Sequence, residues 1–494
     1  MLAPCPFGWE FLGASDSAFS SDFVMRWSVG HHSFEDQDFV SITEHARKLE
    51  GLTLAQIAEI VGKPELLEAK GKGVAGQLLQ TWFRLPENDN RAEPDLPGVR
   101  LPDGRIVGLE IKAVPLMPRS RGFSVKERCK VTSINYSELL QESWENSRAR
   151  HKLLTVLFIF YRYAGSRSWA DSQVEKTVAW FLEQSSVRET IRTDWQRTWG
   201  YVDEGRAHDL SEGQALVLGS ATSGAGHESK HVGQPKNPSE TARKRSFALK
   251  PSFLQTTYEA ALKPGRFASI TTLRGQPLDG DLQSVILGGL KRFVGWKLAE
   301  IAAELGLPQQ KAKQGAALIV RRALGVVTDE RRLLELEAAG VKPKTVPVRE
   351  EDLWPLEAMS FPVMRLVEFA EEDWEASELR THLDCLLLLP FLAKKREQEA
   401  WGRRLARPFF WTPTGVEEEG IASEWRKFQK EVQDGNAAYT RENGRRVSKL
   451  TPSSRTTYLH LRPKGRDGSV DDVDPLGRPT QQLCFWLNQS FVQS

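Results

Sequence analysis

The sequence has little cysteine and no long hydrophobic segment. Its 494 residues include only four cysteines, none of them in a C-x-x-C pair. Single, widely spaced cysteines argue against a zinc site built on cysteine pairs and against a disulfide framework. No run approaches the ~20 apolar residues of a membrane-spanning helix, and the first residues lack the basic start and apolar centre of a signal peptide. We therefore expect a reduced, cytoplasmic protein with no membrane partner.

A strong charge of one sign is also absent. The 67 Lys and Arg and the 65 Asp and Glu leave a formal charge of +2, so total charge does not identify a nucleic-acid binder. Hydrophobic residues at 40% and charged residues at 27% exclude wholesale disorder. The length suggests two or three domains. Tryptophan, in contrast, is plentiful, with 15 residues.

The chain repeats itself once. Residues 46–62 and 290–306 carry the same Gly, Leu, Ala and Ile pattern, and each segment predicts a short amphipathic helix that ends at a glycine. Further matches follow in the same order: Trp144 with Trp374, Asp194-Trp195 with Glu424-Trp425, and residues 247–253 with 485–491. We therefore expect an N-terminal extension (1–38), a first domain (39–260), a connector (261–284) and a homologous second domain (285–494).

One segment of the first half is rich in Gly, Ser and Pro. Residues 219–245 contain almost no large apolar side chains and end in Arg243-Lys244-Arg245. This composition predicts a mobile loop rather than a core segment. It is either a solvated linker or a flexible arm that closes on a polyanion.

A candidate chemical site follows a predicted hairpin. Asp95 precedes the turn sequence Leu101-Pro-Asp-Gly104, and the next strand carries Glu110 and Lys112 two residues apart. Because side chains alternate along a strand, both point to the same face of the sheet, while Leu109, Ile111 and Ala113 face apolar packing.

Two carboxylates and a backbone carbonyl make a hard-oxygen site that suits Mg²⁺. An adjacent ammonium can position a water or stabilise charge at a phosphate, so the pattern fits metal-assisted phosphodiester hydrolysis. Two other Glu-x-Lys matches, at 68–70 and 228–230, fall in a helical stretch and in the polar loop. The alternative for Glu110-Ile-Lys112 is an exposed ion pair on a strand.

The order of the motifs resembles the MutH family of endonucleases. The segments that carry the likeness are GLTLAQIAEIVG, LLEAKGKGVAGQLLQTWF, EPD…GLEIKAVPL and SWENSRARHKLLTVLF, which run through most of residues 40–255. The family includes a GATC-nicking mismatch-repair enzyme and larger two-domain type II restriction enzymes that cut at GATC. The resemblance implies the PD-(D/E)XK nuclease fold, an α/β (α+β) mixed sheet flanked by helices, present here as two tandem copies.

The resemblance also implies roles for individual residues. Asp95, Glu110, Lys112 and Lys152 match the catalytic residues, and Asp95, Glu110 and the carbonyl of Ile111 match the Mg²⁺ ligands. A helix that borders the site carries Lys72 and Gln80, where the family commonly has a glutamate in place of Gln80. Gln accepts a hydrogen bond but brings no charge, which puts a second metal and tight metal binding in doubt.

The second half lacks this constellation. Lys344 keeps the lysine, but Lys342 replaces the metal-binding glutamate and His382 stands in place of Lys152. Glu335 is the candidate for the first carboxylate, and one acid does not make a metal site. We therefore interpret the second half as a catalytically inactive copy.

DNA contacts are predicted from both halves. Tyr458-Leu-His-Leu-Arg462-Pro-Lys464 resembles the family's strand and loop that enter the DNA grooves, and Phe485-Trp486 matches its aromatic pair, with core packing the favoured role of Phe485. The first half departs from this loop pattern, which leaves Lys230, Lys236 and Arg243 as alternatives for base recognition. The predicted DNA-binding residues are Arg243, Lys244, Arg245, Lys250, Arg462, Lys464 and Trp486.

The favoured function is a Mg²⁺-dependent type II restriction endonuclease that acts on double-stranded DNA. One live site per chain implies that the protein dimerises on DNA, bridges two sites, or nicks the strands in turn. A strand-nicking repair enzyme, a non-cleaving DNA-binding protein of the same fold, and a tryptophan-rich scaffold without a DNA role are the alternatives.

Overall fold

The fold is described from a computed structural model of the chain. It covers residues 34–491 except 69–72, 87–92, 120–121, 166–168, 223–230, 276–277, 279, 308–314, 327–330, 396–397, 443–444, 465–470 and 490. The expected N-terminal extension therefore lies almost entirely outside the described residues, as does Lys72. In the part that is described, no helix is both long enough and apolar enough to cross a membrane.

The first half opens with a lobe of three short helices. Asp38 caps the first of them by accepting a hydrogen bond from the backbone N–H of Ser41, and Thr53 forms a capping box with Gln56 at the second. Gly51, with φ +88°, turns the chain between them. The helices are α1 (Phe39–Arg47), α2 (Leu54–Ile60) and α3 (Val74–Trp82).

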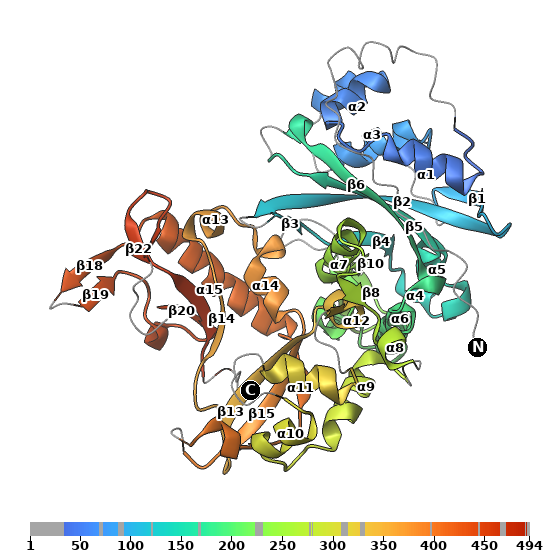
Figure 1. Ribbon diagram of the computed structural model, residues 1–494. Helices are drawn as coiled ribbons and strands as arrows, with labels where there is room; N and C mark the ends of the chain where they lie inside the picture. Colours follow the sequence, from blue (N-terminus) through green and yellow to red (C-terminus); the bar gives the residue numbers. More distant parts are fainter. Residues whose placement is uncertain are drawn as a thin grey trace.

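These helices cover one face of a mixed sheet of order β1-β2-β5-β6, with β3 paired to β2 (Figure 1). The strands are β1 (Leu96–Arg100), β2 (Ile106–Arg119), β3 (Gly122–Val125), β5 (Thr155–Arg162) and β6 (Gln173–Phe181). β2 and β5 run parallel, whereas β1, β3 and β6 pair antiparallel with their neighbours. The α/β mixed-sheet prediction is confirmed.

A second layer of the first half holds a three-stranded sheet of order β4-β10-β7 and four helices. Its strands are β4 (Cys129–Ser133), β7 (Leu218–Thr222) and β10 (Arg245–Leu249), and its helices are α4 (Tyr136–Leu139), α5 (Arg148–Leu153), α6 (Arg188–Asp203) and α7 (Pro251–Leu262). The prediction of a mobile loop at 219–245 is wrong at both ends, because Ser220 and Ala221 lie buried in β7 and Ala242 is buried in β9. Between them stands the small hairpin of β8 (His231–Gly233) and β9 (Thr241–Arg243).

The second half repeats this plan. Its helices are α9 (Leu282–Lys291), α10 (Leu298–Glu304), α11 (Gly315–Ala323), α12 (Leu334–Ala338), α13 (Leu366–Ala370), α14 (Glu378–Leu383) and α15 (Gly415–Gln433). The main sheet has β13 (Lys342–Arg349), β15 (Leu386–Ala393), β16 (Arg404–Leu405) and β17 (Phe409–Trp411), and a second sheet has the order β14-β23-β20. Those last strands are β14 (Met359–Val363), β20 (Leu459–Pro463) and β23 (Leu483–Leu487). The outer hairpins are β18 (Tyr439–Glu442) with β19 (Arg445–Ser448), and β21 (Asp471–Val473) with β22 (Pro479–Gln481).

Paired side chains show that the two halves share more than an outline. Trp144 lies 5.9 Å from Trp195 between ring centroids, and Trp374 lies 5.6 Å from Trp425. These pairs anchor α6 and α15 in the same manner. The tandem repeat predicted from the sequence is confirmed.

The same helices hold a strand through a carboxylate. Asp194 in α6 accepts hydrogen bonds from the backbone N–H groups of residues 216, 217 and 218. Glu424 in α15 accepts them from residues 457, 458 and 459. Each acid therefore fixes the start of the strand that follows, β7 or β20, and these two positions carry a structural function.

The buried core crosses the expected boundary between the halves. Helices α1–α3 and the facing sheet enclose one core, and α13–α15 with β20 and β23 enclose another. Between them, a continuous apolar core joins the second layer of the first half to α9–α11 of the second half. The connector contributes to it, since it forms β11 (Phe267–Ala268) and α8 (Ile270–Arg274), and Ile270 is fully buried.

Candidate active site

The β1–β2 hairpin places the first carboxylate. Gly104, with φ +85°, closes the turn, and the antiparallel ladder sets Leu96 opposite Leu109. Asp95 therefore lies beside the middle of β2, where its Oδ2 accepts a hydrogen bond of 2.8 Å from the backbone N–H of Ile111. The predicted hairpin is confirmed, and it accounts for an acid that is fifteen positions from its partner Glu110 in the sequence.

Two lysines converge on Glu110. The Lys112 ammonium donates to Oε1 at 2.6 Å, and the Lys152 ammonium lies 3.1 Å from Oε1 and 3.2 Å from Oε2. Lys152 reaches the strand from α5, whose first turn Ser147 caps. Glu110 is 2% exposed, so the three charges share a poorly solvated site. The prediction that Glu110 and Lys112 share one face of the strand is confirmed.

The neighbouring charges shift the protonation equilibria of the site. Burial and the charge of Glu110 raise the pKa of Asp95. Burial opposes the charged form of Lys112, but the negative charge of Glu110 outweighs it and the pKa of Lys112 is raised. Lys112 is therefore a cation at neutral pH in this state, placed to donate hydrogen bonds and to stabilise negative charge.

These residues line an open cleft of about 660 Å³ between the helical lobe and β4. Gln80 of α3 borders it as predicted, without a carboxylate. Three further cationic residues stand in the walls, and they were not predicted from the sequence: Arg128, Lys130 and Arg148. Alternation along the strand Cys129–Ser133 was the available signal for Lys130, because it leaves Val131 buried and turns Lys130 outward. Burial and the charges of Lys112, Lys244 and Lys152 lower the pKa of Lys130, which indicates a positive field in the cleft.

Gly108 makes room for the first carboxylate. A Cβ at this position would lie 2.5 Å from Cγ of Pro94, the residue directly before Asp95. Substitution Gly108→Ala should push Pro94 and Asp95 away from β2 and lower the rate of DNA cleavage by about 10-fold, a typical cost of mispositioning a site group. Gly98→Ala is the matched control, since nothing lies within 4 Å of its Cβ. Equal cleavage rates for the two variants would contradict this placement of Asp95.

The second half keeps the scaffold but not the acids. Parallel pairing sets Glu110 opposite Val156 and Lys112 opposite Phe158, and in the same manner sets Lys342 opposite Leu386 and Lys344 opposite Leu388. The suggestion that Glu335 occupies the first carboxylate's place is wrong. Its buried carboxylate accepts hydrogen bonds from Ser269 and from the backbone N–H of Ile270, and so holds the start of α8.

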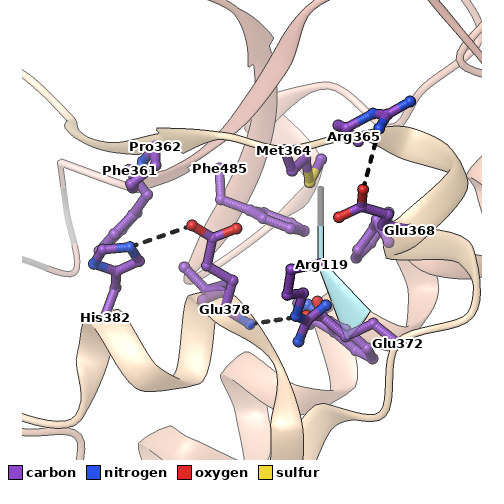
Figure 2. Close-up of a pocket in the computed structure, with 13 residues that line it drawn as sticks. Arg119, Phe361, Pro362, Met364, Arg365, Glu368, Glu372, Glu378, His382 and Phe485 are labelled. Carbon is purple, nitrogen blue, oxygen red and sulfur yellow. Dashed lines mark hydrogen bonds and ion pairs between the residues drawn. The ribbon is translucent and has the colours of Figure 1, made fainter. Parts of the chain in front are cut away.

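A pocket of the second half, bordered by His382 at the position of Lys152, is partly filled by a residue of the first (Figure 2). Arg119, at the far end of β2, forms an ion pair of 2.8 Å with Glu372. Burial raises the pKa of Glu372 to about 7, although Arg119 opposes the shift. His382 faces Glu378 across 3.6 Å in the same cleft. The two halves therefore meet at a charged contact beside His382.

Of the predicted DNA-binding residues, some are accessible. Arg243 is exposed and pairs with Glu419 at 3.1 Å, and Lys244, Arg462 and Lys464 are exposed as well. Trp486 is half-buried and stacks on His460. Phe485 is 4% exposed in the core, as expected. Of the alternatives, Lys236 pairs with Asp203 on the surface, and Lys230 lies outside the described residues.

Two of the predicted DNA contacts are wrong. Arg245 is buried and donates to the backbone carbonyls of Ser220 and Leu210. Lys250 is 0% exposed, and its ammonium lies 2.9 Å from Asp384 of the second half. Both cations therefore bind partners inside the protein. The reason is that β10 lies between β4 and β7 and is not part of a flexible arm.

In the comparison with known proteins, one family model matches two separate segments of the chain. The family model described as the DNA mismatch repair enzyme MutH matches residues 86–194 and again residues 324–424. The type II restriction enzyme Sau3AI of Staphylococcus aureus is 26% identical over 337 residues, which are 65% of this chain and 66% of that enzyme. The DNA mismatch repair protein MutH of Haemophilus influenzae (strain PittEE) is 26% identical over 211 residues, 42% of this chain and 91% of that protein. The MutH protein of Salmonella paratyphi B is 26% identical over 214 residues, 42% of this chain and 86% of that protein.

Proposed function

Because the chain belongs with the MutH-like DNA endonucleases, we propose that it is a Mg²⁺-dependent type II restriction endonuclease of double-stranded DNA. GATC is the target that the family resemblance implies. In this proposal the first half cuts, and the second half is a catalytically inactive DNA-binding effector. The observation that carries the proposal is the meeting of Asp95, Glu110, Lys112 and Lys152 in one open cleft of the first half.

The donor set fits a magnesium ion. Two carboxylates, Asp95 and Glu110, stand beside the backbone of Ile111, and hard oxygen ligands are those that Mg²⁺ prefers. Among the described residues, no cluster of three or more His, Cys, Asp or Glu side chains suits a metal. When bound, Mg²⁺ supplies a Lewis acid and an activated water.

The chain's own residues supply charge and orientation. The Nζ groups of Lys112 and Lys152 donate hydrogen bonds to Glu110 in this structure. The same donors are placed to bind a phosphate oxygen. Lys130 in the cleft wall attracts the DNA backbone toward the site. Arg128 and Arg148 of the same wall are already paired with Glu212 and Glu138. Gln80 offers a hydrogen-bonding amide to a water or base without adding charge.

Strand products on a supercoiled plasmid test this proposal. With Mg²⁺, a restriction enzyme converts the plasmid to linear DNA, whether two chains cut together or one site cuts both strands in turn. Persistent open circles would instead indicate a nicking enzyme. A plasmid that remains supercoiled with Mg²⁺ and with Mn²⁺ would contradict the nuclease proposal, and DNA binding at low salt would then separate a non-cleaving DNA-binding protein from a scaffold without a DNA role.

A further inference from the structure

The second half carries lysines where the first half carries its nuclease site. By the register of β13 and β15, Lys342 stands in the position of Glu110 and Lys344 in the position of Lys112. Lys464, at the end of β20, approaches the same place from the other side of β14. A position that is acidic in one copy is therefore cationic in the other.

These lysines have no acidic partner among the residues that the structure describes. The Lys344 ammonium donates to the carbonyl oxygen of Ser360 at 2.9 Å, and the Lys464 ammonium donates to that of Phe361 at 2.6 Å. For the Lys342 ammonium, the described part of the chain supplies neither a hydrogen bond nor an ion pair. The carboxylate of Glu378 nearby is engaged with His382 (Figure 2). Lys344 and Lys464 thus meet two neutral carbonyls and no counter-charge among the described residues, and Lys342 stands two residues before Lys344 on β13.

Holding two ammonium groups close together and partly buried costs free energy when no anion is bound. Burial lowers the pKa of Lys344 to about 8, and the charge of Lys464 adds to the shift. A partly buried ammonium beside another cation is stabilised when a negative group binds between them. The ring of Phe361, whose centroid is 5.1 Å from the Lys344 nitrogen, gives only a weak substitute.

We propose that Lys342, Lys344 and Lys464 bind a phosphodiester group of duplex DNA directly, without a metal ion. The site is the counterpart of the catalytic cleft, with ammonium groups in place of a metal held by carboxylates. Its ligand is a phosphate of the DNA backbone, which suits a half that holds DNA and does not cut it. This inference rests on the proposed DNA-binding function of the second half.

The test measures binding of a labelled GATC-containing duplex to the full chain by fluorescence anisotropy in EDTA. Lys344→Gln and Lys342→Gln each remove one cation, Lys344→Arg restores it, and Lys430→Gln is the control on the exposed face of α15. We expect the slope of log Kd against log salt to fall by about one for each loss of a phosphate contact. The control and Lys344→Arg should keep the wild-type slope.

A scan of methylphosphonates, each neutralising one phosphate of the duplex, locates the contact. At one position the neutral phosphate should weaken binding by the wild type but not by Lys344→Gln, because the same contact is already lost. If no position shows this coupling, or if Lys344→Gln and Lys430→Gln have equal slopes, the inference is overturned. Thermal unfolding of each variant separates lost contacts from lost folding, and Lys342→Gln repeats the test two residues earlier in β13.

Inorganic phosphate distinguishes a general anion site from a DNA site. If added inorganic phosphate leaves the effect of the neutral phosphate at the coupled position unchanged, both in the wild type and in Lys344→Gln, the contact is made by the duplex. Competition by phosphate at concentrations that leave the control unaffected would assign the site to free phosphate and overturn the DNA assignment. Because these measurements read binding in EDTA, their failure is independent of Mg²⁺-dependent cleavage, which tests the proposed function.

Discussion

Replacing Glu110 with Gln should abolish cleavage while the protein still binds DNA. The variant keeps the size and a carbonyl oxygen but removes the carboxylate that both Lys112 and Lys152 contact. Loss of a metal-binding acid costs several kcal/mol of transition-state stabilisation, so the cleavage rate should fall by on the order of 10³-fold. The measurement is single-turnover cleavage of a duplex with Mg²⁺.

Glu59→Gln is the matched control for this change. Glu59 is exposed on α2, away from the cleft, and its substitution should leave the cleavage rate unchanged. Circular dichroism and DNA binding in EDTA check that Glu110→Gln is folded, since the change leaves two lysines in a buried site. A folded Glu110→Gln variant that cuts at the wild-type rate would remove Glu110 from the catalytic site.

Replacing Lys250 with Met should destabilise the protein and leave its DNA contacts unchanged. The buried ammonium is paired with Asp384 across the two halves, so the substitution leaves that carboxylate without its partner. Breaking a buried pair by removing one partner costs about 3–5 kcal/mol. The measurement is the free energy of unfolding from denaturant titration, followed through the transition that reports the core common to both halves.

Lys244→Met gives the opposite expectation. Lys244 is exposed six residues earlier in the chain, so its loss should spare stability and reduce the salt slope of DNA binding by about one if it contacts a phosphate. The pair of variants separates a structural lysine from a binding lysine. An unchanged unfolding free energy for Lys250→Met, together with a reduced salt slope, would show that Lys250 contacts DNA after all.

Local patterns in the sequence predicted the repeat and the strand of the candidate site because both depend on short-range rules. Alternation fixes the common face of Glu110 and Lys112, and a turn sequence with a glycine at φ +85° returns the chain past Asp95. The tryptophan pairs were visible as matched positions, although their ring contacts were not. Helix α5 brings Lys152 to the site over 42 residues, and only the family resemblance indicated that approach.

The errors concern residues whose position depends on long-range packing. Arg245 and Lys250 lie in a basic segment after a polar loop, and composition alone suggested an exposed arm. The structure pairs β10 with both β4 and β7, which makes it a central strand and buries its polar residues. Glu335 likewise followed a plausible spacing, but its carboxylate holds a helix start. No local pattern distinguishes such internal partners from DNA.

The core shared between the halves could not be predicted from the sequence either. The connector contains turn-forming residues, yet Ile270 within it is buried beside helices of the second half. Each half carries the full order of helix and strand motifs, so the sequence predicts two separate domains. Whether a surface apolar residue covers its own domain or its neighbour depends on tertiary contacts that periodicity does not encode.

In the proposed function, the first half alone cuts DNA, through the site at Asp95 and Glu110. Digestion of a plasmid of known sequence with Mg²⁺, followed by sequencing of the fragment ends, tests this division of labour. We expect cleavage by the wild type at one short sequence, GATC by family resemblance, and no fragments from Glu110→Gln. Fragments that persist in Glu110→Gln and vanish instead in Lys344→Gln would contradict it, as would a wild type that cuts no DNA with Mg²⁺ or Mn²⁺.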